Sequence, residues 1–101
     1  MNSPKGYKAV RRAVIEALEE GDYQHEARSS IDVKNLLATE EVTAAEVVAL
    51  IRRSDGTQYT CSPLHGNTGL DCHLIKTGGW YVKFYFLDPT TVFISVHLTY
   101  H

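Results

Sequence analysis

The N-terminal half of the chain alternates apolar and polar residues with the period of an α-helix. Val10, Val14 and Leu18 recur every four residues, a spacing that places them on one helical face. Ser3-Pro4 is a helix-starting pair, and Gly21 is a typical helix-ending residue. The pattern therefore predicts an amphipathic helix between these two signals.

Two further helices are predicted before residue 55. Apolar residues at helical spacing predict a short helix from Ser30 to Ala38, with residues 22–25 as a link. Thr43 and Glu46 have the spacing of a capping box, in which each side chain accepts a hydrogen bond from the backbone of the other residue. An apolar run follows this box, and turn-forming residues 54–56 end the predicted helix.

From residue 57 the apolar residues alternate with a period of two, which is typical of β-strands. Four strands are predicted, at residues 57–61, 70–76, 80–87 and 91–98. Residues 63–69 form a loop, whereas residues 77–79 and 88–90 are connections short enough to require antiparallel neighbours. With 101 residues, we expect one α+β domain in which N-terminal helices (1–54) pack on one face of a four-stranded antiparallel sheet (55–101).

Alternation along the last three strands assigns their side chains to two faces. The face expected to pack under the helices contains Leu70, Cys72, Leu74, Trp80, Val82, Phe84, Phe86, Val92, Ile94, Val96 and Leu98. The other face contains Asp71, His73, Ile75, Tyr81, Lys83, Tyr85, Phe93, Ser95 and His97. This second face is rich in histidine and aromatic residues and is the candidate functional surface.

The short connections predict which residues of this face lie side by side. Closure at residues 88–90 sets Tyr81 opposite His97 and Lys83 opposite Ser95. The same reasoning at residues 77–79 sets His73 beside Tyr81. We therefore expect a His73-Tyr81-His97 row across three strands, with Lys83 in the adjacent row.

Two imidazoles, a phenol and an ammonium are suited to cleavage of a phosphodiester without a metal. A neutral histidine can take the proton of a ribose 2′-hydroxyl, and a second histidine or Tyr81 can protonate the leaving oxygen. Lys83 can stabilise the charge on phosphorus. Tyr85 and Phe93 are candidates for stacking splayed bases of single-stranded RNA, with Ser95 beside them.

Plainer interpretations of these residues stay open. An antiparallel sheet often leaves one face in water, and a solvated face has similar residues. If their segment is helical, His25 and Arg28 would share a helical face and could supply a cation to the site, or form a surface pair. Cys61 and Cys72 are expected to be two buried free thiols, although a disulfide between their neighbouring strands is geometrically possible. Neither they nor His73 form a convincing metal site, because neighbours on a strand point to opposite faces.

Charge argues against a general nucleic-acid binder, because the net charge is −2. Residues 1–50 carry six Lys/Arg and nine Asp/Glu, whereas residues 51–101 carry four and three, with four of the five histidines. An anion-binding surface is therefore expected in the second half. No membrane-spanning stretch or secretion signal is present, so a cytoplasmic protein is expected, and no cofactor motif is found.

The second half, about residues 55–98, resembles the MqsR-like and RelE-like bacterial toxins. The resemblance lies in a strand centred on Asp71-Cys72-His73, a Tyr-x-Lys strand at Tyr81 and Lys83, and a last strand that ends at Ser95-Val96-His97. In place of the expected Phe-Tyr-Lys-Ser segment, this chain has Gln58-Tyr59-Thr60-Cys61, and the Lys-rich C-terminal ending is replaced by Leu98-Thr99-Tyr100-His101.

The resemblance implies a RelE-like fold and a toxin of a type II toxin–antitoxin system. Such toxins are metal-independent endoribonucleases that cleave mRNA, often on the ribosome, and are covered by a cognate antitoxin protein. By that pattern Tyr81 corresponds to a catalytic tyrosine, and His97 to the catalytic residue at the end of the last strand. Two alternatives remain: a non-catalytic module, such as an immunity or antitoxin-like protein, that docks a protein partner, and a small-ligand site within the sheet.

Overall fold

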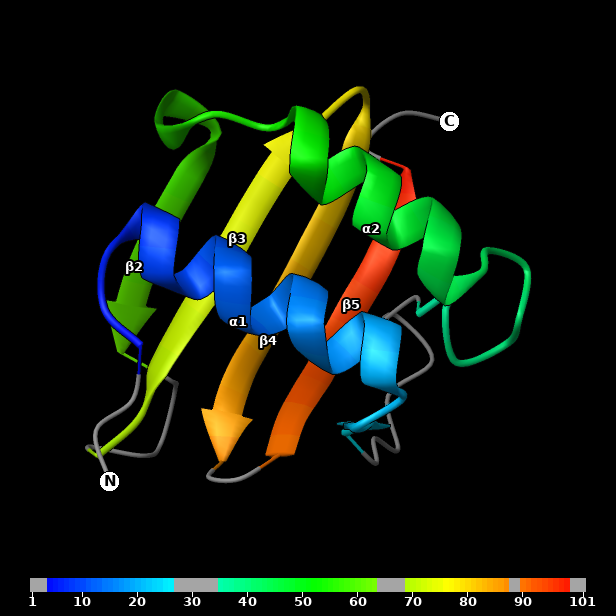
Figure 1. The fold of residues 1–101 in the computed structure, drawn as a ribbon, viewed down its shortest axis with the longest axis horizontal. Helices are drawn as coiled ribbons and strands as arrows, with labels where there is room; N and C mark the ends of the chain where they lie inside the picture. The colour runs from blue at the N-terminus through cyan, green and yellow to red at the C-terminus, as the bar shows by residue number, and fades with distance from the viewer. Residues whose placement is uncertain (1–3, 27–34, 64–68, 88–89, 99–101) are drawn as a thin grey trace.

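The computed structural model describes residues 4–26, 35–63, 69–87 and 90–98, and these form an α+β structure. Its elements in chain order are α1 (Tyr7–Glu20), β1 (Tyr23–His25), α2 (Ala44–Arg53), the 3₁₀ turn η1 (Gly56–Gln58), β2 (Tyr59–Pro63), β3 (Asp71–Thr77), β4 (Trp80–Leu87) and β5 (Thr90–Leu98). The strands form one mixed sheet in the order β1-β5-β4-β3-β2. Both helices lie on one face of this sheet (Figure 1).

Local residue chemistry correctly predicts where α1 ends and where α2 begins. Gly21 adopts a left-handed conformation with φ of 73° and closes α1, as the pattern predicted. The predicted capping box of α2 is confirmed, because the Thr43 hydroxyl accepts from the Glu46 N–H at 3.1 Å and the Glu46 carboxylate accepts from the Thr43 N–H at 2.9 Å. The predicted start at Ser3-Pro4 is wrong for its described part, because residues 4–6 are not helical and α1 begins at Tyr7; Ser3 lies outside the described residues.

A fifth strand, β1, corrects the expectation of four antiparallel strands. Residues 23–25 were predicted to be a link, but they pair in parallel with β5, so that Tyr23 lies opposite Thr91 and His25 opposite Phe93. A helix over residues 30–38 is wrong for its described part, since Asn35 bridges Val96 and the Leu36 N–H donates to the Val96 carbonyl at 2.7 Å. Strand β1 was missed because its three residues are too few to show the alternation of a strand in the sequence.

The turn at Gly78-Gly79 sets the register between β3 and β4. Both glycines have positive φ, 57° and 82°, as a two-residue type I′ hairpin turn requires. Thr77 therefore pairs with Trp80, and the ladder continues through Lys76 opposite Tyr81 to His73 opposite Phe84. The predicted pairing of His73 with Tyr81 is wrong, because this register moves every β3 side chain to the other face.

A β-bulge changes the face of the residues in β5 that precede it. Lys83 pairs with Ser95, as predicted, but Phe84 pairs with Phe93, so Ile94 is an extra residue in β5. Phe93 consequently lies on the helix side with Phe84, and Val92 lies on the other side with Tyr85. The predicted faces of Phe93, Val92 and Ile94 are therefore wrong, whereas Tyr81 opposite His97 is confirmed.

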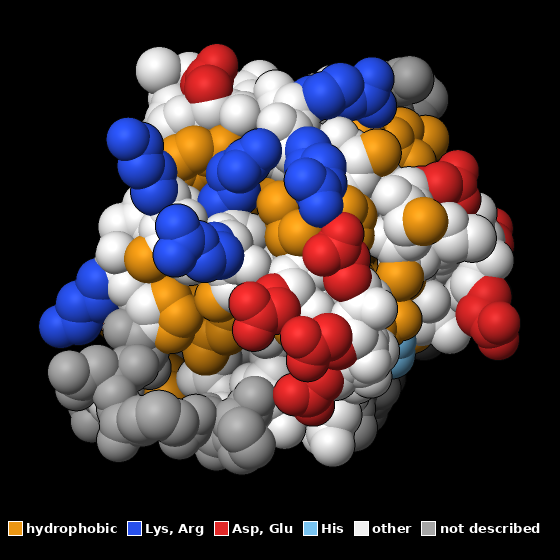
Figure 2. Space-filling model, in the orientation of Figure 1, with side chains coloured by type: hydrophobic (Ala, Val, Ile, Leu, Met, Phe, Trp, Pro, Cys, Tyr) orange, Lys and Arg blue, Asp and Glu red, His pale blue; other side chains and the backbone are white. Residues whose placement is uncertain are grey.

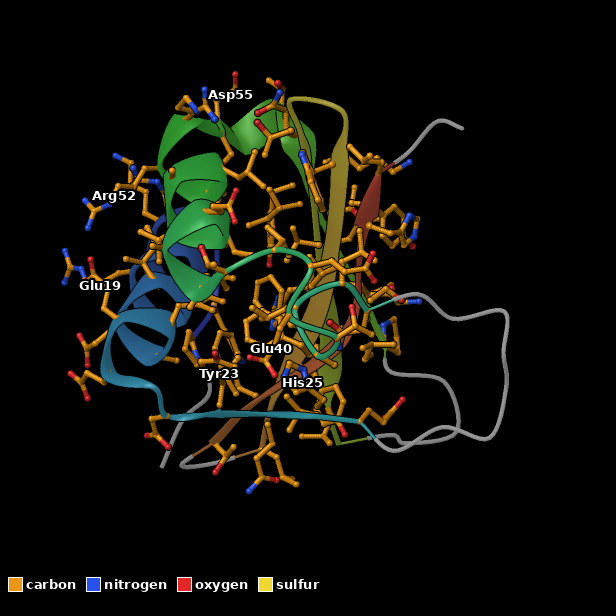
Figure 3. All side chains as sticks on the ribbon, turned by 90° about the vertical axis from the view of Figure 1, so that its right-hand side faces the viewer. Glu19, Tyr23, His25, Glu40, Arg52 and Asp55 are labelled. Carbon is orange, nitrogen blue, oxygen red and sulfur yellow. The ribbon has the colours of Figure 1, made fainter. Side chains whose placement is uncertain are left out.

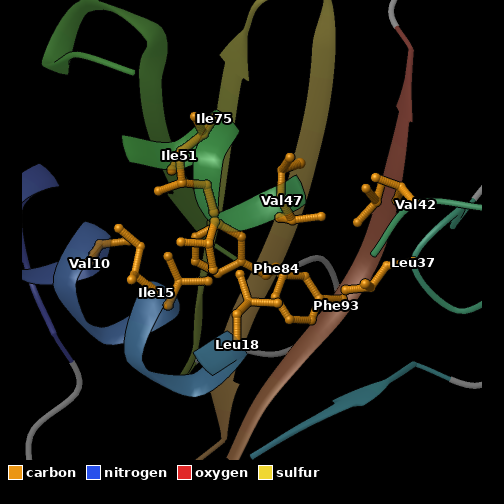
Figure 4. Close-up of a cluster of buried hydrophobic side chains, with 14 of the residues drawn as sticks. Val10, Ile15, Leu18, Leu37, Val42, Val47, Ile51, Ile75, Phe84 and Phe93 are labelled. Carbon is orange, nitrogen blue, oxygen red and sulfur yellow. The ribbon is translucent and has the colours of Figure 1, made fainter. Parts of the chain in front are cut away.

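The core lies between the helices and the sheet (Figure 4). Val10 and Val14 of α1 and Val47 and Ile51 of α2 are fully buried there, with Phe84 below them. A second, smaller cluster lies on the opposite face and contains Cys72, Tyr85, Val92 and Ile94, with Leu70 packed against it. That face is therefore not uniformly open to water.

β2 begins later than predicted. Residues 56–58 form η1 in place of the start of a strand, and β2 continues through Pro63. Asp55 caps this turn by accepting from the Thr57 hydroxyl and from the Thr57 N–H, the latter at 2.9 Å, and these hydrogen bonds lower the pKa of its carboxyl. No helix in the described part of the chain is long and apolar enough to cross a membrane.

Replacement of Gly79 by alanine is expected to destabilise the protein by about 1–2 kcal/mol, because a Cβ disfavours a φ of 82°. Urea unfolding should measure this loss. Gly56→Ala is the matched control, because a Cβ there meets only the Tyr7 side chain at 3.8 Å and Gly56 has no positive φ. Equal stability of the two variants would show that the turn does not constrain the register.

Candidate functional site

A row of three polar side chains crosses the face of the sheet that lies opposite the helices. Lys76 of β3, Tyr81 of β4 and His97 of β5 are paired directly across neighbouring strands. Lys76 is exposed, and the two rings are partly exposed. Lys76 thus occupies the place that had been expected for His73.

The three side chains are in mutual contact. The Tyr81 and His97 rings stack with centroids 4.7 Å apart and planes inclined by 15°. The Lys76 Nζ atom lies 5.8 Å from the centroid of the Tyr81 ring, within the range of a cation–π interaction. Tyr81 therefore has a cation on one side and an imidazole on the other.

An open groove of about 530 Å³ runs along this row and around the Gly78-Gly79 turn. Its lining consists of Gln58, Lys76, Thr77, Gly78, Gly79, Trp80, Tyr81 and His97. No carboxylate is present among these described lining residues. Its volume falls in the range of roughly 300–1,000 Å³ that is common for small-molecule sites, and its cationic and donor groups favour an anionic ligand.

A backbone hydrogen bond determines which nitrogen of His97 carries the proton. The Nδ1 atom lies 2.7 Å from the Leu98 carbonyl oxygen. Because a carbonyl oxygen only accepts, Nδ1 must be the donor. In the neutral ring the proton is therefore absent from Nε2, which is the arrangement required of a general base.

The adjacent row contains Leu74, Lys83 and Ser95. Lys83 is partly exposed and lies on the same face of β4 as Tyr81, two residues away, as predicted. Ser95 is buried at 8% exposure. Lys83 can therefore contribute charge near the groove, whereas Ser95 has little surface with which to contact a substrate.

His73 lies on the helix side of the sheet and is 2% exposed. Its ring packs against Phe84 and Phe86, with centroids 5.6 and 5.2 Å away, and its Nδ1 lies 2.8 Å from the Tyr59 hydroxyl. Burial lowers the pKa of His73, although Asp71 partly offsets this effect, and burial raises the pKa of Tyr59. His73 is thus a buried, hydrogen-bonded histidine that does not contact the Tyr81-His97 pair.

The two aromatic residues predicted to stack bases are also buried. Phe93 is 0% exposed on the helix side, where it packs edge-on against Tyr23. Tyr85 is on the expected face, but it belongs to the second buried cluster and its hydroxyl donates to Glu26 at 3.2 Å. Neither ring presents a free face to a ligand.

His25 lies at the edge of the sheet in β1, beside the buried Phe93 (Figure 3). The Asn35 amide nitrogen lies 3.1 Å from the Nδ1 atom of His25, and burial lowers the pKa of His25. His25 pairs with a helix-side residue, so it does not lie on the face that carries Tyr81 and His97. Arg28 lies outside the described residues.

Both cysteines are free thiols. Cys72 is buried as expected, whereas Cys61 is exposed. Cys61 pairs with His73, but Cys72 points to the other face of β3. Within the described residues, no group of three metal-binding side chains is found.

A second group of positive charge lies on the surface of the two helices. Lys8, Arg11 and Arg12 of α1 lie near Arg52 of α2 and share an open groove of about 790 Å³ with Glu16 and Glu19. Figure 2 shows Lys and Arg gathered at one end of this face and Asp and Glu at the other. Arg52 and Glu19, which project outward in Figure 3, form an ion pair at 2.8 Å.

Lys76 and Gln58 line the groove but were not among the predicted site residues. A signal for Lys76 was present in the sequence. Two consecutive glycines favour a two-residue hairpin turn, and that turn pairs Thr77 with Trp80 and hence Lys76 with Tyr81. No equivalent local signal indicates Gln58, because it enters the groove through the fold of η1.

Comparison with known proteins does not assign the chain to a family. No model of a protein family, no curated protein and no solved structure matches it. The class that can be stated is an α+β protein whose described residues form two helices on a five-stranded mixed sheet.

The buried His73 predicts a pH-dependent stability. Because its pKa is lower in the folded state, the unfolded chain gains a proton at higher pH, near 6.5. The free energy of unfolding should therefore be highest above that pH and decrease as the pH falls through 6.5 toward the folded-state pKa. His25 acts in the same direction.

His73→Gln should reduce this pH dependence, since glutamine is neutral and can still hydrogen-bond the Tyr59 hydroxyl. Urea unfolding between pH 8 and pH 5 would measure the slope, and His25→Gln serves as the control for the second histidine. Identical slopes for wild type and His73→Gln would contradict the assignment of His73 as a buried neutral group.

Proposed function

We propose that this protein is a metal-independent endoribonuclease whose catalytic pair is Tyr81 and His97. The observation that carries the proposal is the stacked pair itself, with the free Nε2 of His97 and the ammonium of Lys76 in one groove without described carboxylates. These groups supply a base, a proton donor and a positive charge. Cleavage of a phosphodiester in single-stranded RNA uses all three.

In the proposed reaction, His97 Nε2 takes the proton of a ribose 2′-hydroxyl. The 2′-oxygen forms a bond to the adjacent phosphorus, and the bond from phosphorus to the 5′-oxygen breaks, which leaves a 2′,3′-cyclic phosphate. Tyr81 donates its hydroxyl proton to the leaving 5′-oxygen. Lys76, with Lys83 from the next row, stabilises the charge on phosphorus. Solvent then removes the proton from His97 and returns one to Tyr81.

The wider biological role follows the resemblance of residues 55–98 to MqsR-like and RelE-like toxins. We infer a RelE-like toxin of a type II toxin–antitoxin system that acts on mRNA in the cytoplasm, with a cognate antitoxin as its protein partner. The Lys missing from the family's Phe-Tyr-Lys-Ser segment is replaced by Thr60, which pairs with Leu74. Lys76, in the same strand as Leu74 and on the same face, supplies a cation in its place.

A second candidate function is a non-catalytic module that docks a protein partner, such as an immunity or antitoxin-like protein. The mixed charge of the helix surface favours it, since Lys8, Arg12 and Glu16 are exposed beside one groove. Expression alone would discriminate: an endoribonuclease toxin should arrest growth unless its antitoxin is present, whereas an immunity protein should be harmless.

The catalytic assignment predicts that His97→Ala and Tyr81→Phe each reduce cleavage of single-stranded RNA at least 100-fold, because each removes one proton-transfer step. Lys76→Met should reduce it about tenfold or more through loss of charge. A gel assay on labelled RNA with EDTA present would measure the rates, and the product should carry a 2′,3′-cyclic phosphate.

His25→Ala is the matched control, because it removes an exposed histidine from outside the groove and should leave the rate unchanged. Thermal unfolding should show that the variants remain folded. Wild-type rates in both His97→Ala and Tyr81→Phe would refute the catalytic pair, and lack of cleavage of free and ribosome-bound RNA by the wild type would refute the proposed activity.

A further inference from the structure

The groove extends past Lys76 to a fourth polar residue, Gln58. Tyr59 pairs with Ile75 at the end of the β2–β3 ladder, and Gln58, the last residue of η1, precedes Tyr59 and lines the groove together with Lys76. Gln58, Lys76, Tyr81 and His97 consequently follow one another along the same groove. If the phosphate of a nucleotide lies at Tyr81 and His97, its base would lie along the row. The base would then be either near Gln58 or on the side opposite to Gln58.

The orientation of the Gln58 amide is determined by its backbone partner. Gln58 Oε1 accepts a hydrogen bond from the Asp55 N–H at 3.0 Å as part of the capping box of η1. A backbone N–H only donates, so the accepting atom must be the amide oxygen and the other atom must be Nε2. Within the described part of the chain, Nε2 of Gln58 donates no hydrogen bond, and Gln58 is partly exposed.

An amide held in this way offers only hydrogen-bond donors to a ligand. A free glutamine pairs with adenine by using both its atoms, accepting from N6 and donating to N7. Gln58 cannot form that pair without releasing the Asp55 N–H. Its two N–H donors instead match a carbonyl oxygen, and the neighbouring Lys76 is also donor-only.

We propose that Gln58 determines base specificity at the nucleotide next to the cleaved phosphate, favouring guanine and uracil over adenine and cytosine. Guanine O6 and uracil O4 are acceptors at the position where adenine and cytosine carry an amino group. Trp80 is partly exposed and lines the same groove, although it also packs against the helix-side core. This inference rests on RNA being the ligand of the groove, as proposed above.

The test uses variants that separate base recognition from folding. Gln58→Glu keeps an oxygen acceptor for the Asp55 N–H but replaces both donors with a second acceptor. Gln58→Met removes donors and acceptor together. Binding of fluorescent 2′-O-methyl oligonucleotides, which cannot be cleaved, would be measured by anisotropy for oligo-U, oligo-A and oligo-C.

The wild type should bind oligo-U about tenfold more tightly than oligo-A or oligo-C. Gln58→Met should bring these ratios close to one, and Gln58→Glu should reverse them, while overall affinity falls because of the added negative charge. Equal binding of oligo-U and oligo-A by the wild type, or an unchanged ratio in Gln58→Glu, would overturn the specificity assignment.

Binding and cleavage assays together distinguish a wrong role for Gln58 from a wrong catalytic activity. If the base preference is absent but the corresponding 2′-hydroxyl RNA is cleaved in a His97-dependent manner, the activity stands and the role of Gln58 does not. If the preference is present and lost in Gln58→Glu without any cleavage, the groove is a base-selective RNA-binding site, and the endoribonuclease activity is refuted.

Discussion

The position of every side chain on β3 depends on the two-residue turn at Gly78-Gly79. A side-chain period of two means that a shift of one residue in pairing moves the whole strand to the opposite face. Because both glycines accept positive φ, Thr77 pairs with Trp80, which places Lys76 beside Tyr81 and sends His73 under the helices. With a three-residue connection, Ile75 would lie opposite Tyr81 in place of Lys76.

Burial then confines the candidate site to one end of the sheet. The bulge at Ile94 directs Val92 and Ile94 to the face opposite the helices, where they join Tyr85 and Cys72 in a second buried cluster. Nearer the Gly78-Gly79 turn, the same face has Lys76, Tyr81 and His97 accessible. The chemistry available to this protein is therefore concentrated around the hairpin end, where the groove lies.

Backbone groups orient the two polar side chains whose direction matters most. The Leu98 carbonyl requires Nδ1 of His97 to donate, and the Asp55 N–H requires the amide oxygen of Gln58 to accept. Both partners are close in sequence to the side chain that they orient, so they do not depend on distant packing. One nitrogen of each side chain is thereby directed away from the backbone and made available in the groove.

Local sequence determined helices α1 and α2, the capping box, the four later strands and the Tyr81-His97 pair, because periodicity, caps and short turns act over a few residues. Tertiary structure decided three features. The parallel pairing of β1 with β5 joins residues far apart in the chain, and the bulge at Ile94 depends on packing Phe93 against Phe84. The burial of His73 followed from a register three residues away from the predicted one, because an odd shift moves each β3 side chain to the other face.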